Sequence, residues 1–387
     1  RYGADAVYLS GRRFGMRAAA DNFSLEEMER AVGAAHAAGV RVYVTVNTMP
    51  RSDEYPALGD YLEELDRIGA DALIIADLGV LALARERAKH TEYHISTQAG
   101  AVSYADCNEW HRLGASRVVL ARELSLEDMR LIREKIPPEL ELEAFVHGSM
   151  CVSWSGRCLL SAALTGRDSN RGMCAQPCRW SYSLIEEKRP GQYFDITETD
   201  KGTYILNAND LCMAENLDKM ANSGIDSIKI EGRAKSHYYV AVTANAYRGA
   251  LDSLKAQQGK WKCPSWVTEE LNKISHRTYS TGFYFGKPQN AQTYRDAGYI
   301  RDYSVAAVAE GYENGCITAT LKNKFSKGQV FDCLEPKSAP FTVTANELFN
   351  EAGEPINEEP HPMMIIKIPF SRPVKKGALF RMKTVRE

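Results

Sequence analysis

A short unit of turn, apolar strand and amphipathic helix recurs along much of this 387-residue chain, and it constrains the fold more than any other feature. The turns include Gly3-Ala4-Asp5 and Gly69-Ala70-Asp71, and each leads into an apolar segment. We expect strands at residues 6–9, 42–46, 72–75, 93–96, 117–120, 142–146 and 227–230. Near-continuous apolar strands that alternate with helices are typical of a parallel sheet covered by helices.

The helices between these strands are marked at their N-termini. Ser24 and Glu27 form a capping box, and Ser125 begins a similar helix that Pro137-Pro138 ends. Strands in this alternation predict an α/β fold, a TIM-like (β/α)8 barrel whose first strand lies upstream of Arg1. An open doubly wound sheet is the alternative. A dinucleotide-binding glycine motif and a P-loop are both missing, so the sequence does not support standard nucleotide binding.

The repeat ends near residue 254, and we expect three regions. Residues 1–254 form the barrel with a cysteine-rich insertion at 151–212, residues 255–302 a linker, and residues 303–387 a small all-β, barrel-like domain. Strands of that domain are expected at residues 304–310, 317–321, 330–334, 341–345 and 364–368. Basic residues dominate from Met363 onward, which indicates either a local basic face that attracts RNA or an ordinary solvated surface.

Composition narrows the class of protein. The chain is 44% hydrophobic and 25% charged, which is ordinary for a soluble globular protein. Its apolar runs are too short to span a bilayer, and a secretory signal is not visible. Nine cysteines, an odd number, fit metal binding or redox work in a reducing compartment better than complete disulfide pairing. We therefore expect a cytoplasmic protein with no membrane partner.

The cysteines cluster in one segment. Five of the nine lie between residues 143 and 212. They are Cys151, Cys158, Cys174, Cys178 and Cys212. Neighbouring thiolates resist ionising together unless a cation joins them, so the cluster predicts a metal ion or an iron–sulfur cluster. The spacing matches neither a zinc ribbon nor a bacterial ferredoxin, so zinc stays an alternative to iron–sulfur, and burial as small apolar residues is the competing interpretation. The isolated Cys107, Cys263, Cys316 and Cys333 are interpreted as structural.

Polar residues follow most of the predicted strands, where barrel loops carry chemistry. These loops hold Asn47-Thr48, Ala76-Asp77, Ser96-Thr97-Gln98, Arg122-Glu123, His147-Gly148-Ser149 and Glu231-Gly232-Arg233. His94 and His147 stand at strand ends as candidate acid–base groups. Cations that can bind an acidic small molecule or RNA phosphate, or else pair with carboxylates such as Glu231, are Arg157, Arg167, Arg171, Arg179, Lys229 and Arg233.

One run in the cysteine segment resembles a known family. The pattern Glu143-x-Phe145-x2-Gly148-Ser149-Met150-Cys151-x4-Gly156-x-Cys158-x-Leu160-Ser161 is similar to the signature of peptidase family U32, the collagenase-like peptidases. Residues 94–98, 167–168, 178–180, 206–212 and 229–233 are also similar to that family. The likeness covers roughly residues 1–254 and the β-rich extension.

The resemblance implies one of two functions. The family name implies a peptidase, whereas other members are hydroxylation proteins acting on tRNA wobble uridine, on ribosomal RNA or in ubiquinone synthesis. Those members hold a four-iron four-sulfur (4Fe-4S) cluster on four cysteines, and the RNA-acting ones depend on prephenate. By position, the resemblance implies the ligands Cys151, Cys158, Cys174 and Cys212, with Cys178 as an alternative ligand.

We therefore expect a prephenate-dependent enzyme that converts tRNA wobble uridine to 5-hydroxyuridine, with an iron–sulfur cluster at the barrel mouth. Its expected partners are tRNA, a small acidic donor and a paired family member. The acid–base candidates are His94, His147 and Glu231. The alternatives are a peptidase with a Ser or Cys nucleophile beside His147, and a non-catalytic partner that binds RNA.

Overall fold

The computed structural model describes the chain except for residues 17–21, 151–157, 181–196, 200–201, 205–208, 234, 258, 287–299, 359–360 and 385–387. The chain forms two compact units. We call Asp5–Ala234 with Arg277–Gly298 the barrel unit. The C-terminal unit comprises Arg1–Ala4, Lys235–His276 and Tyr299–Glu387. Residues 235–254, assigned to the barrel from the sequence, thus belong to the C-terminal unit, and the segment expected as a linker divides between the two units.

Seven strands of the barrel unit lie parallel and follow one another in chain order. They are β1 (Ala6–Ser10), β2 (Arg41–Val46), β3 (Ala72–Ile75), β4 (Glu92–Ile95), β5 (Arg117–Val119), β6 (Glu141–Ser149) and β10 (Ser227–Ile230). The sheet curls until Lys229 Nζ on β10 lies 4.7 Å from the centre of the Tyr8 ring on β1. This consecutive order confirms the predicted TIM-like barrel, because a doubly wound sheet reverses its strand order.

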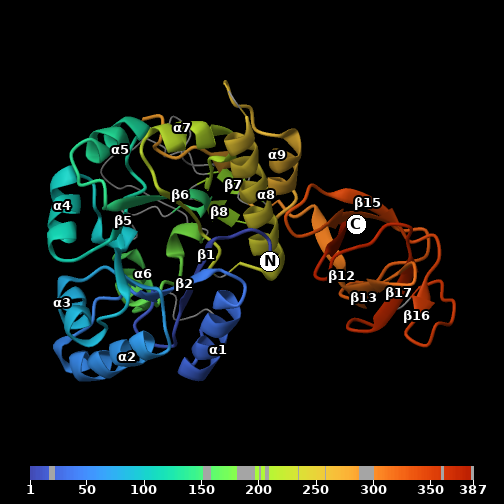
Figure 1. Ribbon diagram of the computed structural model, residues 1–387, viewed down its shortest axis with the longest axis horizontal. Coiled ribbons are helices and arrows are strands. Elements are labelled where there is room, and N and C mark those ends of the chain that lie inside the picture. The colour runs from blue at the N-terminus through green and yellow to red at the C-terminus, as the bar shows by residue number, and fades with distance from the viewer. Residues whose placement is uncertain are drawn as a thin grey trace. The chain divides into compact units, whose positions relative to one another are not determined.

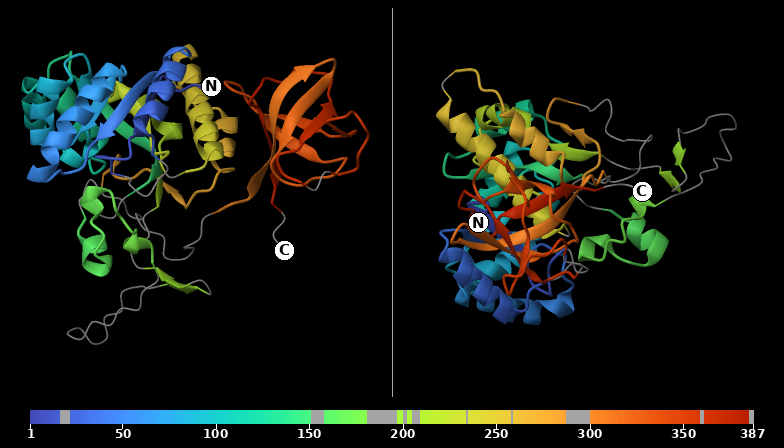
Figure 2. Two further views of the ribbon diagram at one scale, coloured as in Figure 1. Left: turned by 90° about the horizontal axis from the view of Figure 1, so that it is seen from below. Right: turned by 90° about the vertical axis from the view of Figure 1, so that its right-hand side faces the viewer.

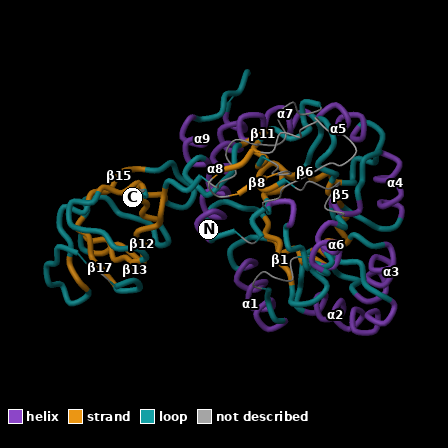
Figure 3. The backbone as a smooth tube through the Cα atoms, turned by 180° about the vertical axis from the view of Figure 1, so that it is seen from behind, coloured by secondary structure: helices purple, strands orange, loops and turns teal. Residues whose placement is uncertain are grey.

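Helices cover the outside of the sheet, as Figures 1 and 3 show. They are α1 (Leu25–His36), α2 (Tyr55–Arg67), α3 (Leu78–Arg87), α4 (Tyr104–Arg112), α5 (Leu126–Arg133) and α7 (Leu217–Asn222). The predicted capping box is confirmed: Glu27 N–H donates to Ser24 Oγ at 3.2 Å, and Ser24 N–H donates to Glu27 Oε2 at 2.7 Å. Ser125 caps α5 in the same way, with Asp128 as its partner.

The cysteine-rich insertion carries short elements. Helix α6 (Leu160–Thr165) stands apart from the ring of helices, in green in Figure 2. Strand β9 (Asp210–Cys212) pairs antiparallel with the end of β6, and β11 (Tyr279–Ser280) pairs parallel with β9. A two-stranded hairpin is formed by β7 (Thr197–Thr199) and β8 (Gly202–Tyr204). The single-turn helices of this unit are η1 (Ser52–Glu54), η2 (Thr97–Ala99), η4 (Ser169–Arg171), η5 (Pro177–Arg179) and η6 (Ala214–Asn216).

The C-terminal unit joins two helices, α8 (His237–Ala256) and α9 (Ser265–Leu271), to an antiparallel sheet. The strand order is β15 (Phe341–Thr344), β14 (Val330–Leu334), β18 (Leu379–Lys383), β12 (Tyr303–Glu313), β13 (Cys316–Leu321), β17 (Ile365–Pro369) and β16 (Phe349–Asn350). This confirms the expected all-β domain. Among the helices that the structure describes, none is long and apolar enough to cross a membrane.

One correction concerns the basic C-terminal segment. Arg381 is fully buried in β18, where its guanidinium binds the carboxylate of Glu270 on α9 at 2.5 Å. A buried arginine needs such a partner because desolvation of an isolated charge is costly. Arg381 is therefore part of the interior and not of a basic face.

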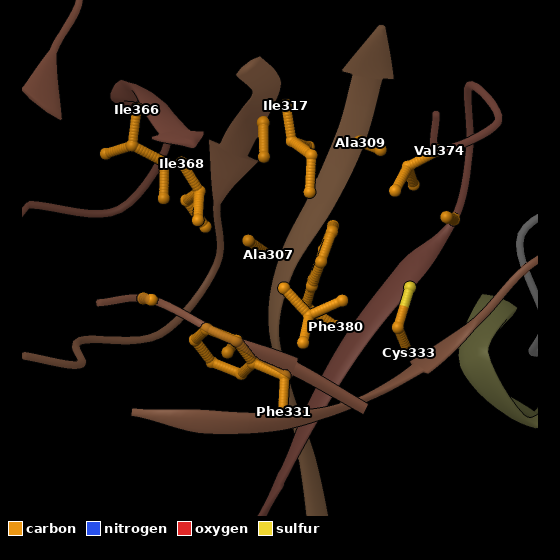
Figure 4. Close-up of a cluster of buried hydrophobic side chains, with 14 of the residues drawn as sticks. Ala307, Ala309, Ile317, Phe331, Cys333, Ile366, Ile368, Val374 and Phe380 are labelled. Atoms are coloured by element: carbon orange, nitrogen blue, oxygen red, sulfur yellow. The ribbon is translucent and has the colours of Figure 1, made fainter. Parts of the chain in front are cut away.

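The curved sheet of the C-terminal unit encloses an apolar core, which Figure 4 shows. Phe331 packs edge-on against Phe380 with the ring centres 5.7 Å apart. Cys333 is buried in the same core, and burial raises the pKa of its thiol to about 12, as expected for a structural cysteine.

Candidate functional site

A cavity of about 160 Å³ opens at the carboxyl ends of the barrel strands. Inward-facing strand residues on its wall are Tyr8, Thr45, Ile74, Val119, Phe145 and Lys229. Loop residues after the strands are Asn47, Ser96, Thr97, Gln98, Arg122, Glu123, Glu231 and Arg233. The α6 segment adds Cys158, Leu160, Ser169, Cys174, Pro177 and Cys178. The polar strand-end loops that the sequence singled out thus largely surround one space.

A buried ion network holds the lysine of this cavity. Lys229 Nζ donates to Glu143 Oε1 at 2.8 Å, and Arg117 Nη1 donates to Glu143 Oε2 at 3.1 Å. Burial opposes the charge of Glu143, but Lys229 and Arg117 outweigh it and lower the pKa of the carboxyl to about 2. Because Glu143 stays ionised, it can hold the Lys229 ammonium in one place on the cavity wall.

Neither predicted histidine lines the cavity, within the part of the chain that the structure describes. His94 is buried, with Nε2 3.2 Å from Glu92 Oε2 and its ring 4.6 Å from that of Tyr43. Burial lowers the pKa of His94, and its neighbour Glu92 only partly offsets this. His147 is also buried, opposite Cys212 on β9 and 5.4 Å from the Tyr279 ring. His94 pairs in register with Ile74 of the lining and shares its face of the sheet, but its ring packs on Tyr43 and not on the cavity.

Glu231 does line the cavity, and its carboxylate is held from several sides. Oε1 accepts hydrogen bonds from the Tyr8 hydroxyl at 3.1 Å and from the Arg233 N–H at 3.1 Å. Oε2 lies 3.6 Å from Arg122 Nη2. Gly148 passes so close that an added Cβ would meet Glu231 Cβ at 2.7 Å, and its φ of +118° also favours glycine. The position of Glu231 therefore depends on Gly148.

Arg122 lines the cavity as well, although its strand-end loop alone did not predict a role for it. Its guanidinium lies 3.7 Å above the centre of the Phe145 ring, and Nη1 donates to the Ser149 carbonyl at 3.0 Å. This cation–π contact holds a planar cation on the cavity wall. An arginine directly after a barrel strand was the signal that could have identified it.

The predicted cations separate into two groups. Lys229 and Arg233 line the cavity, and Arg233 Nη2 donates to Asn22 Oδ1 at 2.6 Å. Arg171 instead binds Glu54 at 2.9 Å, and Arg167 Nε donates to the Met173 carbonyl at 3.1 Å; neither contacts the cavity. Arg157 lies outside the described residues, as does the side chain of Arg179. An ion pair of Arg171 was the alternative weighed from the sequence.

Three of the five clustered cysteines line the cavity: Cys158, Cys174 and Cys178. Cys158 Sγ accepts the N–H of Leu160 at 3.3 Å, and Cys174 Sγ accepts the N–H of Gln176 at 3.4 Å. Such contacts stabilise thiolates, so these sulfurs fit metal or cluster ligation.

The predicted ligand set is only partly visible. Cys151 lies outside the described residues, and Cys212 on β9 is not among the described residues of the cavity lining. Within the described part of the chain, no three His, Cys, Asp or Glu side chains come close enough together to hold a metal ion. The complete ligand set therefore stays a prediction.

The chain is similar in sequence to a known protein family over most of its length. A family model described as "Peptidase family U32" matches residues 1–294, and one for the family's C-terminal domain matches residues 301–381. The chain is 34% identical over 383 residues to tRNA hydroxylation protein P1 of Bacillus subtilis (strain 168), covering 98% of this chain and 90% of that protein.

Two further relatives have names that refer to the hydroxylation of RNA. The tRNA hydroxylation protein P of Escherichia coli (strain K12) is 34% identical over an alignment of 395 residues, with 91% of this chain and 86% of that protein covered. The 23S rRNA 5-hydroxycytidine C2501 synthase of the same organism is 36% identical over 258 residues, covering 67% of this chain and 38% of that protein.

Proposed function

The chain belongs to peptidase family U32, and from this premise we propose that it is an enzyme that hydroxylates RNA. Relatives of nearly the same length are named for tRNA hydroxylation, and a third for making 5-hydroxycytidine in ribosomal RNA. The observation that carries the proposal is the cavity at the barrel mouth, where thiols and cations face one space. A barrel mouth is where enzymes of this fold act.

The proposed substrate is a uridine at the wobble position of tRNA, and the product is 5-hydroxyuridine. A nucleoside can enter a cavity inside a barrel mouth only when its base is unstacked from its neighbours. Unstacking costs little free energy in an unpaired RNA loop. Tyr8 and Phe145 offer aromatic surface to such a base, and the polar loop residues Asn47, Ser96 and Gln98 offer hydrogen-bonding groups.

An iron–sulfur cluster is the proposed cofactor, with zinc as the alternative. Cys158 and Cys174 would hold it together with Cys151 and either Cys212 or Cys178. When bound, a four-iron four-sulfur cluster would supply one-electron chemistry or polarise an oxygen donor. The backbone N–H groups that point at Cys158 and Cys174 support anionic sulfur at this wall.

The remaining cavity residues have proposed roles in binding and proton transfer. Lys229, Arg122 and Arg233 would bind a small acidic donor, because guanidinium and ammonium groups bind carboxylates. The proposed donor is prephenate. Glu231 would hold or move a proton on the cavity wall. His94 and His147 would act only through their neighbours, since neither is among the described residues of the lining.

Peptidase activity is the second candidate, and the family's name is its main support. A serine or cysteine nucleophile needs a base within hydrogen-bond reach. The described residues of the lining include cysteines but no histidine. The geometry therefore gives the peptidase less support than the hydroxylase.

Mass spectrometry of nucleosides tests the proposal. Cells that lack this gene should lack 5-hydroxyuridine and its derivatives in tRNA, and the wild-type gene should restore them. Cys158→Ala should not restore them, and the anaerobically purified variant should lose the visible absorbance of the wild type. Cys263→Ala is the matched control, because this half-buried thiol lies in the other unit and should change neither signal. Unchanged nucleosides together with gelatin cleavage would replace the hydroxylase by the peptidase.

A further inference from the structure

Two neighbouring connections of the C-terminal sheet present exposed cations. Lys337 lies between β14 and β15, and Arg372, Lys375 and Lys376 lie between β17 and β18. We call these four residues the basic surface. The basic surface belongs to the C-terminal unit, whereas the cavity and the cysteine segment belong to the barrel unit.

A buried carboxylate ties the two connections together. Glu335 is 3% exposed, and its oxygens accept the N–H of Lys375 at 2.9 Å and Arg372 Nη2 at 3.1 Å. Lys375 Nζ in turn donates to the Pro336 carbonyl at 3.3 Å. A buried carboxylate that is bonded through both oxygens fixes the backbone around it. These hydrogen bonds therefore hold in place the backbone that carries the cations.

A second anchor reaches the surface from helix α8. Asn245 is 1% exposed; its Oδ1 accepts the N–H of Lys337 at 2.7 Å, and its Nδ2 donates to the Ser338 carbonyl at 2.8 Å. Lys337 has a φ of +59°, which a lysine rarely adopts. Asn245 thus holds Lys337 in a costly conformation, which preorganises its position.

Aromatic rings lie beside the cations. Phe341 and Phe370 are stacked with their centres 6.3 Å apart at 22°, and the guanidinium of Arg372 lies 3.8 Å above the Phe341 ring. Both rings are partly buried and pack against the apolar core of the sheet. The Phe341 ring therefore holds the Arg372 guanidinium in place at the surface by a cation–π contact.

The charge of the surface is only partly compensated. Among the described residues, Lys337 and Lys375 have no carboxylate within ion-pair distance, and Lys376 lies 3.8 Å from Glu310, with both side chains exposed. The acids Glu347, Glu351, Glu354 and Glu358 occupy a different connection, between β15 and β17. A fixed cluster of lysines attracts a polyanion.

We propose that the basic surface binds the phosphate backbone of tRNA. This inference rests on the proposed function for its choice of polyanion, and it adds a docking site outside the catalytic cavity. The lysines would contact phosphates as point charges. Binding at this surface should then be independent of the RNA sequence, and the affinity should fall as the salt concentration rises.

The test measures tRNA affinity of the full chain at several salt concentrations. The variant Lys337→Ala/Lys375→Ala/Lys376→Ala should bind tRNA at least about tenfold more weakly at low salt, and the slope of log K against log salt should fall by about one per lysine. Arg372 is left in place, because its removal would strip the buried Glu335 of a partner. Circular dichroism and thermal unfolding should match the wild type.

Lys322→Ala/Lys324→Ala/Lys327→Ala is the matched control. These lysines are exposed on the β13–β14 connection, so the control removes the same charge from the same sheet. It should change neither affinity nor slope. Equal losses in the two triple variants would overturn the inference in favour of a diffuse charge effect, while leaving the proposed function standing.

Asn245→Ala separates geometry from charge. It keeps every cation but removes the anchor of Lys337, so affinity should fall a few-fold while the salt slope stays near the wild-type value. A wild-type chain that binds no tRNA would overturn both this inference and the proposed function. Tight tRNA binding that all three variants retain would overturn the docking site alone.

Discussion

Both units bury ion pairs, but the buried charges of the two units differ in what they face. Inside the barrel, Arg117, Glu143 and Lys229 form a buried ion network below the cavity. Inside the C-terminal sheet, the apolar core is built from residues such as Phe331, Phe380 and Ile366. The buried pair of Arg381 and Glu270 lies outside that core, between the sheet and α9.

Apolar cores and buried ion networks contribute differently to the stability of a protein. Apolar burial stabilises a core by roughly 25 cal/mol for each Å² removed from water. A buried ion network is weak evidence for stability, because desolvation of the charges offsets most of their attraction. In the barrel, the network fixes the position of the Lys229 charge at the cavity. In the C-terminal unit, the buried charges of Arg381 and Glu270 instead join β18 to α9.

The largest expected effect comes from Glu143→Gln. This substitution keeps the shape of the side chain but leaves Lys229 and Arg117 buried without their shared counter-ion, which should cost about 3–5 kcal/mol of stability. Hydroxylation should fall at least about a hundredfold, since the Lys229 ammonium loses its fixed position. Hydrogen exchange followed by mass spectrometry should locate the loss in the barrel unit.

Glu141→Gln is the control for that variant. Glu141 also binds Arg117, but its side chain is 47% exposed, so its loss should cost no more than about 1 kcal/mol. If both variants lost the same stability, the buried network would have no special role in the barrel.

A smaller effect is expected from Phe380→Ala in the C-terminal core. The cavity left by the ring should destabilise the sheet by about 3 kcal/mol. Urea unfolding and hydrogen exchange should place the loss in the C-terminal unit, and the anaerobic absorbance should stay unchanged. A loss of that absorbance would show that the two interiors are energetically coupled.

The smallest effect is expected from the protonation of His94. His94 has a lowered pKa in the folded barrel, so the unfolded chain takes up a proton below pH 6.5 that the folded chain does not, and stability should fall there. Glu143, with its pKa lowered to about 2 from 4.5, adds a second loss as pH falls between those values. Thermal unfolding at a series of pH values measures both, and His94→Gln should remove the upper step alone.

Local sequence patterns predicted much of the fold but missed parts whose partners are distant. The strand containing Arg381 was overlooked because its basic residues suggested a surface, whereas its partner Glu270 lies 111 residues away in the chain. Strand β11 spans only Tyr279–Ser280, too short to carry a periodic signal. The alternation of Glu141, Glu143 and Phe145 with Leu142 and Ala144 was visible, and it could have shown that one face of β6 is charged.

For the site, the chain order of residues determined that the polar strand-end loops meet, because parallel barrel strands end on the same side. It also determined the turn-strand-helix repeat and the capping of α1 by Ser24. Only the tertiary structure decided that Glu231 and Arg122 line the cavity while His94 and His147 lie outside its described lining. The reason is that the place of a side chain on the sheet depends on register and on contacts with distant strands, which no local pattern encodes.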